Sequence, residues 1–447
     1  MNDKKYDVVV IGAGLFGIAT AYHILQENEE LKMLVVDKAA MAGAGNTAQS
    51  AGMYRDTFSS EVNLILSSTS RDFFRHVQND LGFDLSLKDI KYLWLMDREQ
   101  FESNKTAVET MLDNNLRIEI LEKENIKNKI PELETDFDEN EDAQLLGLKN
   151  IDYAILGFDC GELDADKITR DFYESEYKRM GGEVLYSTKI TKLVLEPIGE
   201  KLGIPGEPVG WQKKKIGAAE TEKGDLIKAE TFIISTGAWA NELLLPIGVN
   251  THTMPLKKSL FRVQHSRLAG LLNNEHFNED KTIPFIIFPM YGIHMKPVKS
   301  NNSIWIGGGN VIGKPFEMTD SRDIKQENNP LDSVEADSRK YEYDLYLTLS
   351  EYLPVLKDLP LTSCWAGFYA MNTMDKNPVI FKPNGIQGLM CVTSGSGSGI
   401  MKADAVGRIA EALYHGKKYA ELFGGKEFKV SRLGLKQRDV DKEDFII

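Results

Sequence analysis

Cysteine is scarce in this chain, and the few cysteines that it has are scattered. The 447 residues include three, Cys160, Cys364 and Cys391, which lie far apart and form no CxxC pair. Such spacing argues against a disulfide framework, a redox dithiol, and a zinc or iron–sulfur site. We therefore expect no bound metal in this protein.

Long apolar runs are also lacking. The longest, at 285–290, is preceded by Pro284 and interrupted by Pro289, and it falls far short of the roughly 20 apolar residues that a membrane-spanning helix needs. A first strand expected within the first ten residues leaves no room for a signal peptide. We expect a cytoplasmic protein, and peripheral docking on a membrane stays open.

Positive charge is in deficit. The chain has 53 Lys and Arg residues against 67 Asp and Glu residues, for a formal net charge of -14. Binding to nucleic-acid phosphates requires a basic face, and the sequence shows no clear sign of one, so nucleic acid is not an expected partner. The apolar content of 42% is ordinary for a packed globular protein, and the length predicts two or three structural domains.

The N-terminal sequence contains a dinucleotide-binding pattern. An apolar, valine-rich run at 7–11 leads directly into GAGLFG at 12–17, and apolar residues then recur at helical spacing. A second short strand at 34–36 ends at Asp37. Strand, glycine turn, helix, strand and acid occur in the order of a βαβ dinucleotide site.

Each glycine of this turn has a separate expected role. Gly12 permits the tight turn, Gly14 lets the backbone approach a pyrophosphate at the positive end of the helix, and Gly17 lets helix and strand pack closely. The carboxylate of Asp37 is expected to accept hydrogen bonds from ribose hydroxyls, and it would repel a 2′-phosphate, which argues against NADP. The pattern leaves FAD and NAD as alternatives.

A second glycine turn, at 394–399, favours FAD. It follows an apolar strand at 388–392 and opens a final helix, so it offers backbone N–H groups and a second positive helix end. A reduced flavin becomes negative around N1 and the C2 carbonyl, and such a helix end would stabilise that charge. Lys402, just inside the helix, is expected to add to the effect.

The order of these motifs resembles the D-amino acid oxidase superfamily of flavoproteins. The segments that carry the resemblance are GAGLFG at 12–17, TFIISTGAW at 231–239, WAGFY at 365–369 and SGSGSG at 394–399. The chain looks closest to the branch that contains sarcosine and dimethylglycine oxidoreductases, archaeal dye-linked L-proline dehydrogenases and a mitochondrial flavoprotein used in complex I assembly.

The resemblance implies a two-domain α/β fold. A Rossmann-like FAD-binding domain with a central parallel sheet would be built from residues 1–90, 151–250 and 360–447, and a substrate or cap domain with an antiparallel sheet from 91–150 and 251–359. FAD would lie extended, with its ring between the domains. The implied FAD-binding residues are Gly12, Gly14, Leu15, Phe16, Gly17, Asp37, Lys38, Gly45, Asn46, Ser50, Ala51, Gly52, Ile190, Thr236, Gly237, Trp239, Gly397, Ser398, Gly399, Ile400, Met401 and Lys402.

Three departures from the family pattern bear on the chemistry. Many amine-oxidising relatives carry a carboxylate-binding arginine two residues after the WAG-like glycine, where this chain has Tyr369 followed by Ala370. Covalent-flavin relatives have a cysteine near this point, whereas Cys364 lies several residues upstream, so noncovalent FAD is expected. Sarcosine oxidases carry an oxygen-activating lysine where we align Trp305, so a dehydrogenase is favoured over an oxidase.

The expected reaction is oxidation of the C–N bond of an amino acid or N-alkyl amino acid, proline-like or sarcosine-like, by hydride transfer to flavin N5. Such a site mainly holds its substrate in place, and a carboxylate substrate needs a cation. The basic side chains that the resemblance places near the ring are Arg55, Lys258, Arg262, His294 and Lys296. Arg55, which follows the 50–52 stretch, is the first choice, although a surface salt bridge is an equally common role for such an arginine.

The remaining candidates keep more than one role. His294 and Lys296 would point inward from one strand, and His294 fits a core histidine better than a catalytic one. Tyr369 could donate its hydroxyl to the substrate or pack against the ring. The alternatives to amine oxidation are a 2-hydroxy-acid or glycerol-3-phosphate type dehydrogenase, with His294 as base, and a flavoprotein subunit or assembly factor without turnover. The electron acceptor could be a quinone, an electron-transfer protein or O2, and the sequence gives no oligomeric state.

Overall fold

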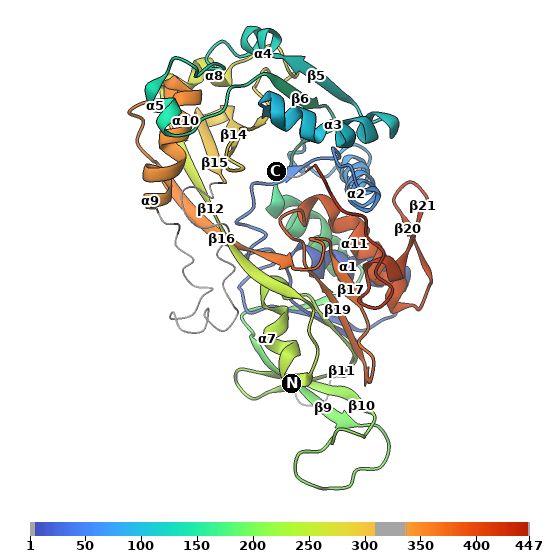
Figure 1. The fold of residues 1–447 in the computed structure, drawn as a ribbon. Helices are drawn as coiled ribbons and strands as arrows, with labels where there is room; N and C mark the ends of the chain where they lie inside the picture. The colour runs from blue at the N-terminus through green and yellow to red at the C-terminus, as the bar shows by residue number, and fades with distance from the viewer. Residues whose placement is uncertain (1–4, 309–335, 337, 446–447) are drawn as a thin grey trace.

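Two large sheets organise the protein (Figure 1). The structure is a computed structural model that describes residues 5–308, 336 and 338–445. Among these residues one sheet has nine strands and the other has eight. The two-domain α/β prediction, with a central parallel sheet in one domain, is confirmed by this arrangement.

The nine-stranded sheet contains the N-terminal motif. Its central strands β19, β11, β1, β2 and β8 all run parallel, as expected for strands joined through helices. In order, the strands are β17 (Val379–Phe381), β19 (Leu389–Thr393), β11 (Leu226–Ile234), β1 (Lys5–Ile11), β2 (Met33–Val36) and β8 (Glu183–Leu185), with β9 (Ile190–Pro197), β10 (Lys214–Thr221) and β18 (Ile386–Gln387) joined through β10.

Helices α1 (Leu15–Glu27) and α11 (Ala403–Tyr414) fasten the two distant halves of this domain. They pack against each other over one face of the sheet (Figure 1). The imidazole of His23 on α1 bonds the carboxylate of Asp404 on α11 at 2.8 Å, with both side chains buried. Burial lowers the pKa of His23, and the pair joins the first and last helices of the nucleotide domain across 381 residues of chain.

The eight-stranded sheet is antiparallel except at one pair, β13 and β4, which run parallel. In the sequence, β4 precedes and β13 follows the nucleotide-domain strands β8 to β11. No hairpin therefore joins β4 to β13 and fixes their relative direction. In order, the strands are β16 (Ser363–Asn372), β12 (Thr253–Gln264), β15 (Ser303–Gly307), β14 (His294–Val298), β13 (Phe285–Ile287), β4 (Tyr92–Met96), β6 (Tyr153–Gly157) and β5 (Ile118–Glu122).

Helices cover the outer side of this second sheet (Figure 1). They supply a separate hydrophobic core, to which Ile126, Leu271 and Tyr352 contribute. The helices are α4 (Lys123–Lys129), α5 (Glu141–Leu145), α8 (Ala269–Leu272) and α10 (Tyr346–Tyr352). Helix α3 (Arg98–Asp113) packs on the other face of the sheet, where Tyr92, Trp94 and Phe285 lie. Strands β6 and β16 lie in this sheet, although our ranges placed their residues in the FAD-binding domain, so the domain boundaries stay a prediction.

Helix α2 (Glu61–Asn79) is capped by the C-terminal segment of the chain rather than by its own N-cap side chain. The carboxylate of Asp441 accepts from the backbone N–H groups of Glu61 and Val62, and that of Glu443 accepts from Ser59 and Ser60. Three of the N–H groups that the start of α2 leaves unsatisfied, those of Ser60, Glu61 and Val62, are thereby paired. The residues near 440 therefore hold α2 in place beside α11.

The β9–β10 hairpin projects away from the rest of the molecule, at the bottom of Figure 1. The two strands carry a long loop at their end. The Gly-, Pro- and Lys-rich composition of 197–228 predicts an exposed hairpin in this part of the chain. In the described part of the chain, every helix is too short or too polar to cross a bilayer.

Candidate active site

A cavity of about 740 Å³ lies between the two sheets. Its nucleotide side is formed where the parallel strands β1, β2, β11 and β19 end, at Gly12, Asp37, Ser235 and Ser394. Ligands of open parallel sheets bind at the carboxyl ends of the strands, because the helix starts and loops converge there. The opposite wall comes from the eight-stranded sheet.

The first glycine turn is shaped for close backbone contact. Gly12 has a φ of +107°, and a Cβ there would stand 2.4 Å from the carbonyl oxygen of Ser235. Gly14 is the N-cap of α1 and forms no side-chain cap, while Thr47 accepts a hydrogen bond from Leu15 N–H at 3.2 Å. The positive end of α1 therefore opens on the cavity, as a pyrophosphate requires.

Buried polar atoms without partners mark the same wall. Within the described residues, the hydroxyls of Ser235 and Thr236 and the indole N–H of Trp239 are buried and form no hydrogen bond. All three residues line the cavity. Because such atoms are costly to leave unpaired, they indicate that this end of the cavity is built for a polar ligand.

Asp37 is held in the position expected for the ribose acid. Its carboxylate accepts from the backbone N–H of Ala13 at 2.6 Å and from that of Ala39 at 2.8 Å. These bonds fix the carboxylate at the end of β2 and leave each oxygen a further lone pair toward the cavity. The next residue, Lys38, places its Nζ 5.3 Å from the centroid of the Trp239 ring.

The structure brings most of the expected FAD-binding residues to this one cavity. Those that line it are Gly12, Gly14, Leu15, Phe16, Asp37, Lys38, Gly45, Asn46, Ser50, Ala51, Ile190, Thr236, Gly237, Trp239, Gly397, Gly399, Ile400 and Met401. Gly17, Gly52, Ser398 and Lys402 lie behind the lining instead. Gly17 packs against Gly12, and Gly52 packs against the carbonyl of Leu163, so both support the turns rather than the ligand.

Lys402 points away from the cavity. Its ammonium donates to the side-chain oxygen of Asn63 on α2 and lies 3.5 Å from that of Asn377. Burial, with the nearby charge of Arg55 acting in the same direction, lowers the pKa of Lys402 to about 7. We expected this lysine to face the flavin; in the structure it lies between α2 and the final helix, and the flavin-side wall is formed by Gly399, Ile400 and Met401.

An aromatic row and a lysine form the far end of the cavity. Tyr92 and Phe285 stack with centroids 4.5 Å apart, and Phe285 stacks on His294 at 5.4 Å. Lys258 on β12 and Tyr369 on β16 complete this end. The Tyr369 ring lies against Gly397, where a Cβ would stand 2.5 Å from it.

His294 is held as a neutral imidazole. Its Nδ1 bonds the carbonyl oxygen of Gly292 at 3.1 Å, so Nδ1 carries the proton and Nε2 keeps a lone pair. Burial lowers the pKa of His294 to about 4, and the charge of Lys258 acts in the same direction. Lys258 lines the same cavity, two residues along β12 from Leu260, which pairs with the Gly307 of β15 that also pairs with His294.

Three of the expected substrate-binding cations, Arg55, Arg262 and Lys296, lie outside the lining. The guanidinium of Arg262 donates to the side-chain oxygen of Gln264 on the same strand. Arg55 is buried, and its guanidinium donates to the carbonyl oxygens of Thr57 at 2.9 Å and Phe445 at 3.3 Å. Lys296 donates to the carbonyl oxygen of Ala51 at 2.6 Å and pairs with Glu162 at 2.8 Å. The positions of Arg55 and Lys296 support the loops around the cavity, and the assignment of all three cations to the substrate stays a prediction.

Sequence reasoning missed several residues that line the cavity. Thr47, Tyr92 and Phe285 belong to no motif, because a loop and two strands of the second sheet carry them. Thr47 could have been found as an acceptor for the exposed start of α1. Nothing in the local sequence of Tyr92 or Phe285 distinguishes a cavity-lining aromatic from a core one.

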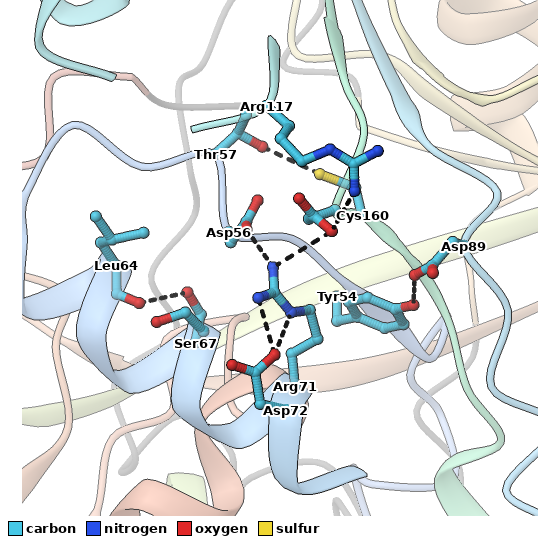
Figure 2. Close-up of polar contacts among 12 residues, drawn as sticks. Tyr54, Asp56, Thr57, Leu64, Ser67, Arg71, Asp72, Asp89, Arg117 and Cys160 are labelled. Atoms are coloured by element: carbon cyan, nitrogen blue, oxygen red, sulfur yellow. Dashed lines mark hydrogen bonds and ion pairs between the residues drawn. The ribbon is translucent and has the colours of Figure 1, made fainter. Parts of the chain in front are cut away.

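A charged cluster joins α2 to the loop that follows β6 of the second sheet (Figure 2). Arg71 on α2 pairs with Asp56 and with Asp72, the latter at 2.9 Å, and its guanidinium lies 3.9 Å from Asp159. Figure 2 shows the guanidinium of Arg71 between the carboxylates of Asp56 and Asp72. Burial raises the pKa of Asp56 to about 6, and Arg71 only partly offsets that effect.

This raised pKa predicts a pH-dependent stability. A carboxyl whose folded pKa exceeds the unfolded value of about 3.9 stabilises the fold when protonated, so the free energy of unfolding should fall by about 2 kcal/mol as pH rises from about 4 to about 6. Asp56→Asn should flatten this part of the profile in urea unfolding. Asp72→Asn, which changes the more exposed partner of Arg71, should keep the slope; an equal slope in Asp56→Asn and the unmodified protein would contradict the assignment.

Comparisons with known proteins agree with this geometry. A family model described as FAD dependent oxidoreductase (DAO) matches residues 7–413. The chain is 22% identical over 440 residues to FAD-dependent oxidoreductase domain-containing protein 1 of Xenopus laevis, covering 92% of this chain and 80% of that protein. It is 21% identical over 338 residues to mitochondrial L-2-hydroxyglutarate dehydrogenase of Bos taurus, covering 72% and 66%.

A solved structure with the same fold is L-proline dehydrogenase from P. horikoshii, with a TM-score of 0.68, 22% identity, and coverage of 93% of this chain and 94% of that one. The family match extends from the first strand of the nucleotide sheet into α11, and so includes both glycine turns of the cavity. The chain belongs to the FAD dependent oxidoreductase (DAO) family, and FAD is its cofactor.

Proposed function

We propose that this protein oxidises the C–N bond of an amino acid or N-alkyl amino acid, proline-like or sarcosine-like, and acts as a dehydrogenase. The observation that carries the proposal is Lys258, a lysine that lines the cavity together with the aromatic row. It supplies what a carboxylate substrate needs in a chain that lacks the arginine at the Tyr369 position. The proline dehydrogenase fold of the solved relative is in keeping with such a substrate.

The protein's own residues would act mainly by positioning. FAD, when bound, supplies the acceptor for the hydride of the substrate C–H bond. Lys258 would bind the carboxylate, while Tyr92 and Phe285 would exclude water and present an apolar wall to the substrate side chain. The neutral state of His294 removes a second positive charge from the place where the amine would lie.

The choice of dehydrogenase rests on the surroundings of Trp305. Lys296 places an ammonium 4.8 Å from the Trp305 ring, but this cation is paired with Glu162 and bonded to Ala51. A neutralised cation attracts superoxide-like charge weakly, so reduction of O2 should be slow. Hydrogen peroxide formation that keeps pace with dye reduction would contradict the dehydrogenase assignment.

A 2-hydroxy acid dehydrogenase is the second candidate. Oxidation of an alcohol needs a base for the hydroxyl proton, and His294 lines the cavity with the Nε2 lone pair that such a base requires. Lys258 would bind the carboxylate here as well. The similarity to L-2-hydroxyglutarate dehydrogenase also supports this candidate.

An anaerobic titration should separate the candidates. We expect proline, sarcosine or dimethylglycine to bleach the flavin spectrum of the purified protein, because these substrates reduce bound FAD. Bleaching by lactate, 2-hydroxyglutarate or glycerol-3-phosphate alone would replace the amine proposal with the alcohol one. Bleaching by none of them would favour the third alternative, a flavoprotein subunit or assembly factor without turnover.

FAD should be held without a covalent bond. Among the described residues that line the cavity none is a cysteine, and Cys364 lies outside the lining. Acid precipitation should therefore release the yellow cofactor quantitatively into the supernatant. Flavin colour that remains in the protein pellet would contradict the prediction, and unfolding in guanidinium chloride controls for FAD trapped in the precipitate.

A further inference from the structure

The loop at 198–213, which joins β9 to β10 and which we name the projecting loop, carries apolar side chains outward. Ile198, Leu202, Ile204 and Trp211 are exposed, and Trp211 reaches 75% exposure. Soluble surfaces expose single apolar side chains commonly, but four within one short loop form a patch of the kind that marks an interaction site. The loop stands apart from the body of the protein (Figure 1).

Polar side chains of the same loop turn inward instead. The carboxylate of Glu207 accepts from the backbone N–H groups of Leu202 at 2.8 Å and Gly203 at 3.1 Å. It also accepts from the Gln212 amide at 2.7 Å, and the Gln212 oxygen accepts from Val209 N–H at 2.8 Å. The loop is thus closed by its own polar groups, and its apolar side chains are left for an outside partner.

The loop also reverses the charge of the chain locally. Residues 198–215 contain four lysines and two glutamates, in a protein of net charge -14. Glu207 is used inside the loop, so the exposed charges are three lysines, Lys201, Lys213 and Lys215, against the one glutamate Glu200. A loop with exposed tryptophan, aliphatic side chains and an excess of lysine matches the boundary between lipid headgroups and acyl chains.

We propose that the projecting loop docks this protein on an anionic lipid bilayer, with Trp211, Leu202 and Ile204 in the interface and the lysines against lipid headgroups. A stable protein partner needs about 800 Å² of surface on each side, more than the tip of one narrow loop offers. A bilayer needs no complementary surface, because the tip of the loop can insert between the lipids. The negative charge of an anionic bilayer also attracts the lysines of the loop. The proposal is independent of the reaction that the cavity performs.

Sedimentation with vesicles tests the proposal on the FAD-loaded protein. We expect binding to phosphatidylcholine vesicles that contain about one quarter phosphatidylglycerol, and much weaker binding to phosphatidylcholine alone. Leu202→Ser with Trp211→Ser should weaken binding at least tenfold. Lys213→Gln with Lys215→Gln should weaken it about 25-fold, since each of the two lysines near an anionic surface contributes about fivefold.

Leu145→Ser is the matched control for the apolar change. Leu145 on α5 is 86% exposed but stands outside the projecting loop, so its replacement should leave vesicle binding unchanged. Equal loss in Leu145→Ser would overturn the assignment to the loop. Absence of binding to both kinds of vesicle would overturn the proposal itself.

Fluorescence locates the contact without relying on a loss of binding. Lipids brominated in their acyl chains should quench part of the tryptophan emission when the protein binds, because Trp211 would reach the acyl boundary. Trp211→Phe keeps an apolar aromatic there, so this variant should still sediment with anionic vesicles while the quenched component disappears. Quenching that persists in Trp211→Phe would show that another surface of the protein contacts the membrane, and it would overturn the proposal. Dimers that form without vesicles and depend on the loop would show that the loop binds a second copy of the chain, and they would overturn it as well.

Discussion

Replacing Gly17 with alanine should leave a protein that no longer retains FAD. A Cβ at this position would stand 1.9 Å from the carbonyl oxygen of Gly12 and 3.3 Å from the Ser235 side chain. The oxygen belongs to the backbone of the first glycine turn, so helix α1 or the turn itself must move. Overpacking of this kind costs about 1–3 kcal/mol in folding free energy, and the shift also displaces the N–H groups that would bind the pyrophosphate.

Gly270→Ala is the matched control for this change. Gly270 is an exposed glycine of α8 outside the cavity lining, and a Cβ there would approach only the side-chain oxygen of Glu132, at 3.8 Å. Flavin absorbance per protein and urea unfolding should therefore stay near the unmodified values in Gly270→Ala and fall in Gly17→Ala. A normal flavin content in Gly17→Ala would show that the contact between α1 and the turn is not needed for the cofactor.

Replacing Lys258 with glutamine should lower kcat/KM for the carboxylate substrate by about 30-fold to 1,000-fold while FAD stays bound. The loss corresponds to about 2–4 kcal/mol, the usual cost of removing one partner of a desolvated ion pair. Lys257→Gln is the control, because Lys257 is exposed and its side chain leaves the same strand on the other face. A normal kcat/KM in Lys258→Gln would return Arg55 to first place as the carboxylate anchor.

The pH profile gives Lys258 a second signature. Burial lowers the pKa of Lys258, and the charge of Lys340 acts in the same direction. The carboxylate-binding form is the protonated one, so substrate affinity should be lost as pH rises through this lowered pKa, earlier than a surface lysine would allow. Lys258→Arg should move the alkaline limb to higher pH, because a guanidinium stays charged there.

The cofactor half of the site could be predicted from sequence because local motifs carry it. Gly12, Gly14 and Asp37 lie within one βαβ unit, whose strand and helix periods are short-range properties of the chain. The turn at 394–399 has the same character, since a strand precedes it and a helix follows it. These motifs lie together at the strand ends in the structure.

The substrate half could not be predicted in the same way. The sequence alone does not distinguish between four basic residues expected near the flavin ring, namely Arg55, Lys258, Lys296 and Lys402. The structure separates them by contacts with distant residues: Phe445 engages Arg55, Glu162 pairs with Lys296, and Asn63 bonds Lys402. Such long-range contacts leave no periodic signal, and neither does the parallel pairing of β4 with β13.

The division of the nucleotide sheet between the two ends of the chain also bears on biosynthesis. The ribosome completes β1, Gly12 and α1 early, whereas β19, the turn at 394–399 and the residues near 441 that cap α2 are made last. A chain that stops before β19 contains the glycine turn expected to bind the pyrophosphate. It lacks the turn at 394–399 that is expected to contact the flavin, and it lacks the residues that cap α2. Truncated translation products should therefore be colourless, and flavin colour in a preparation should measure the fraction of chains that were completed.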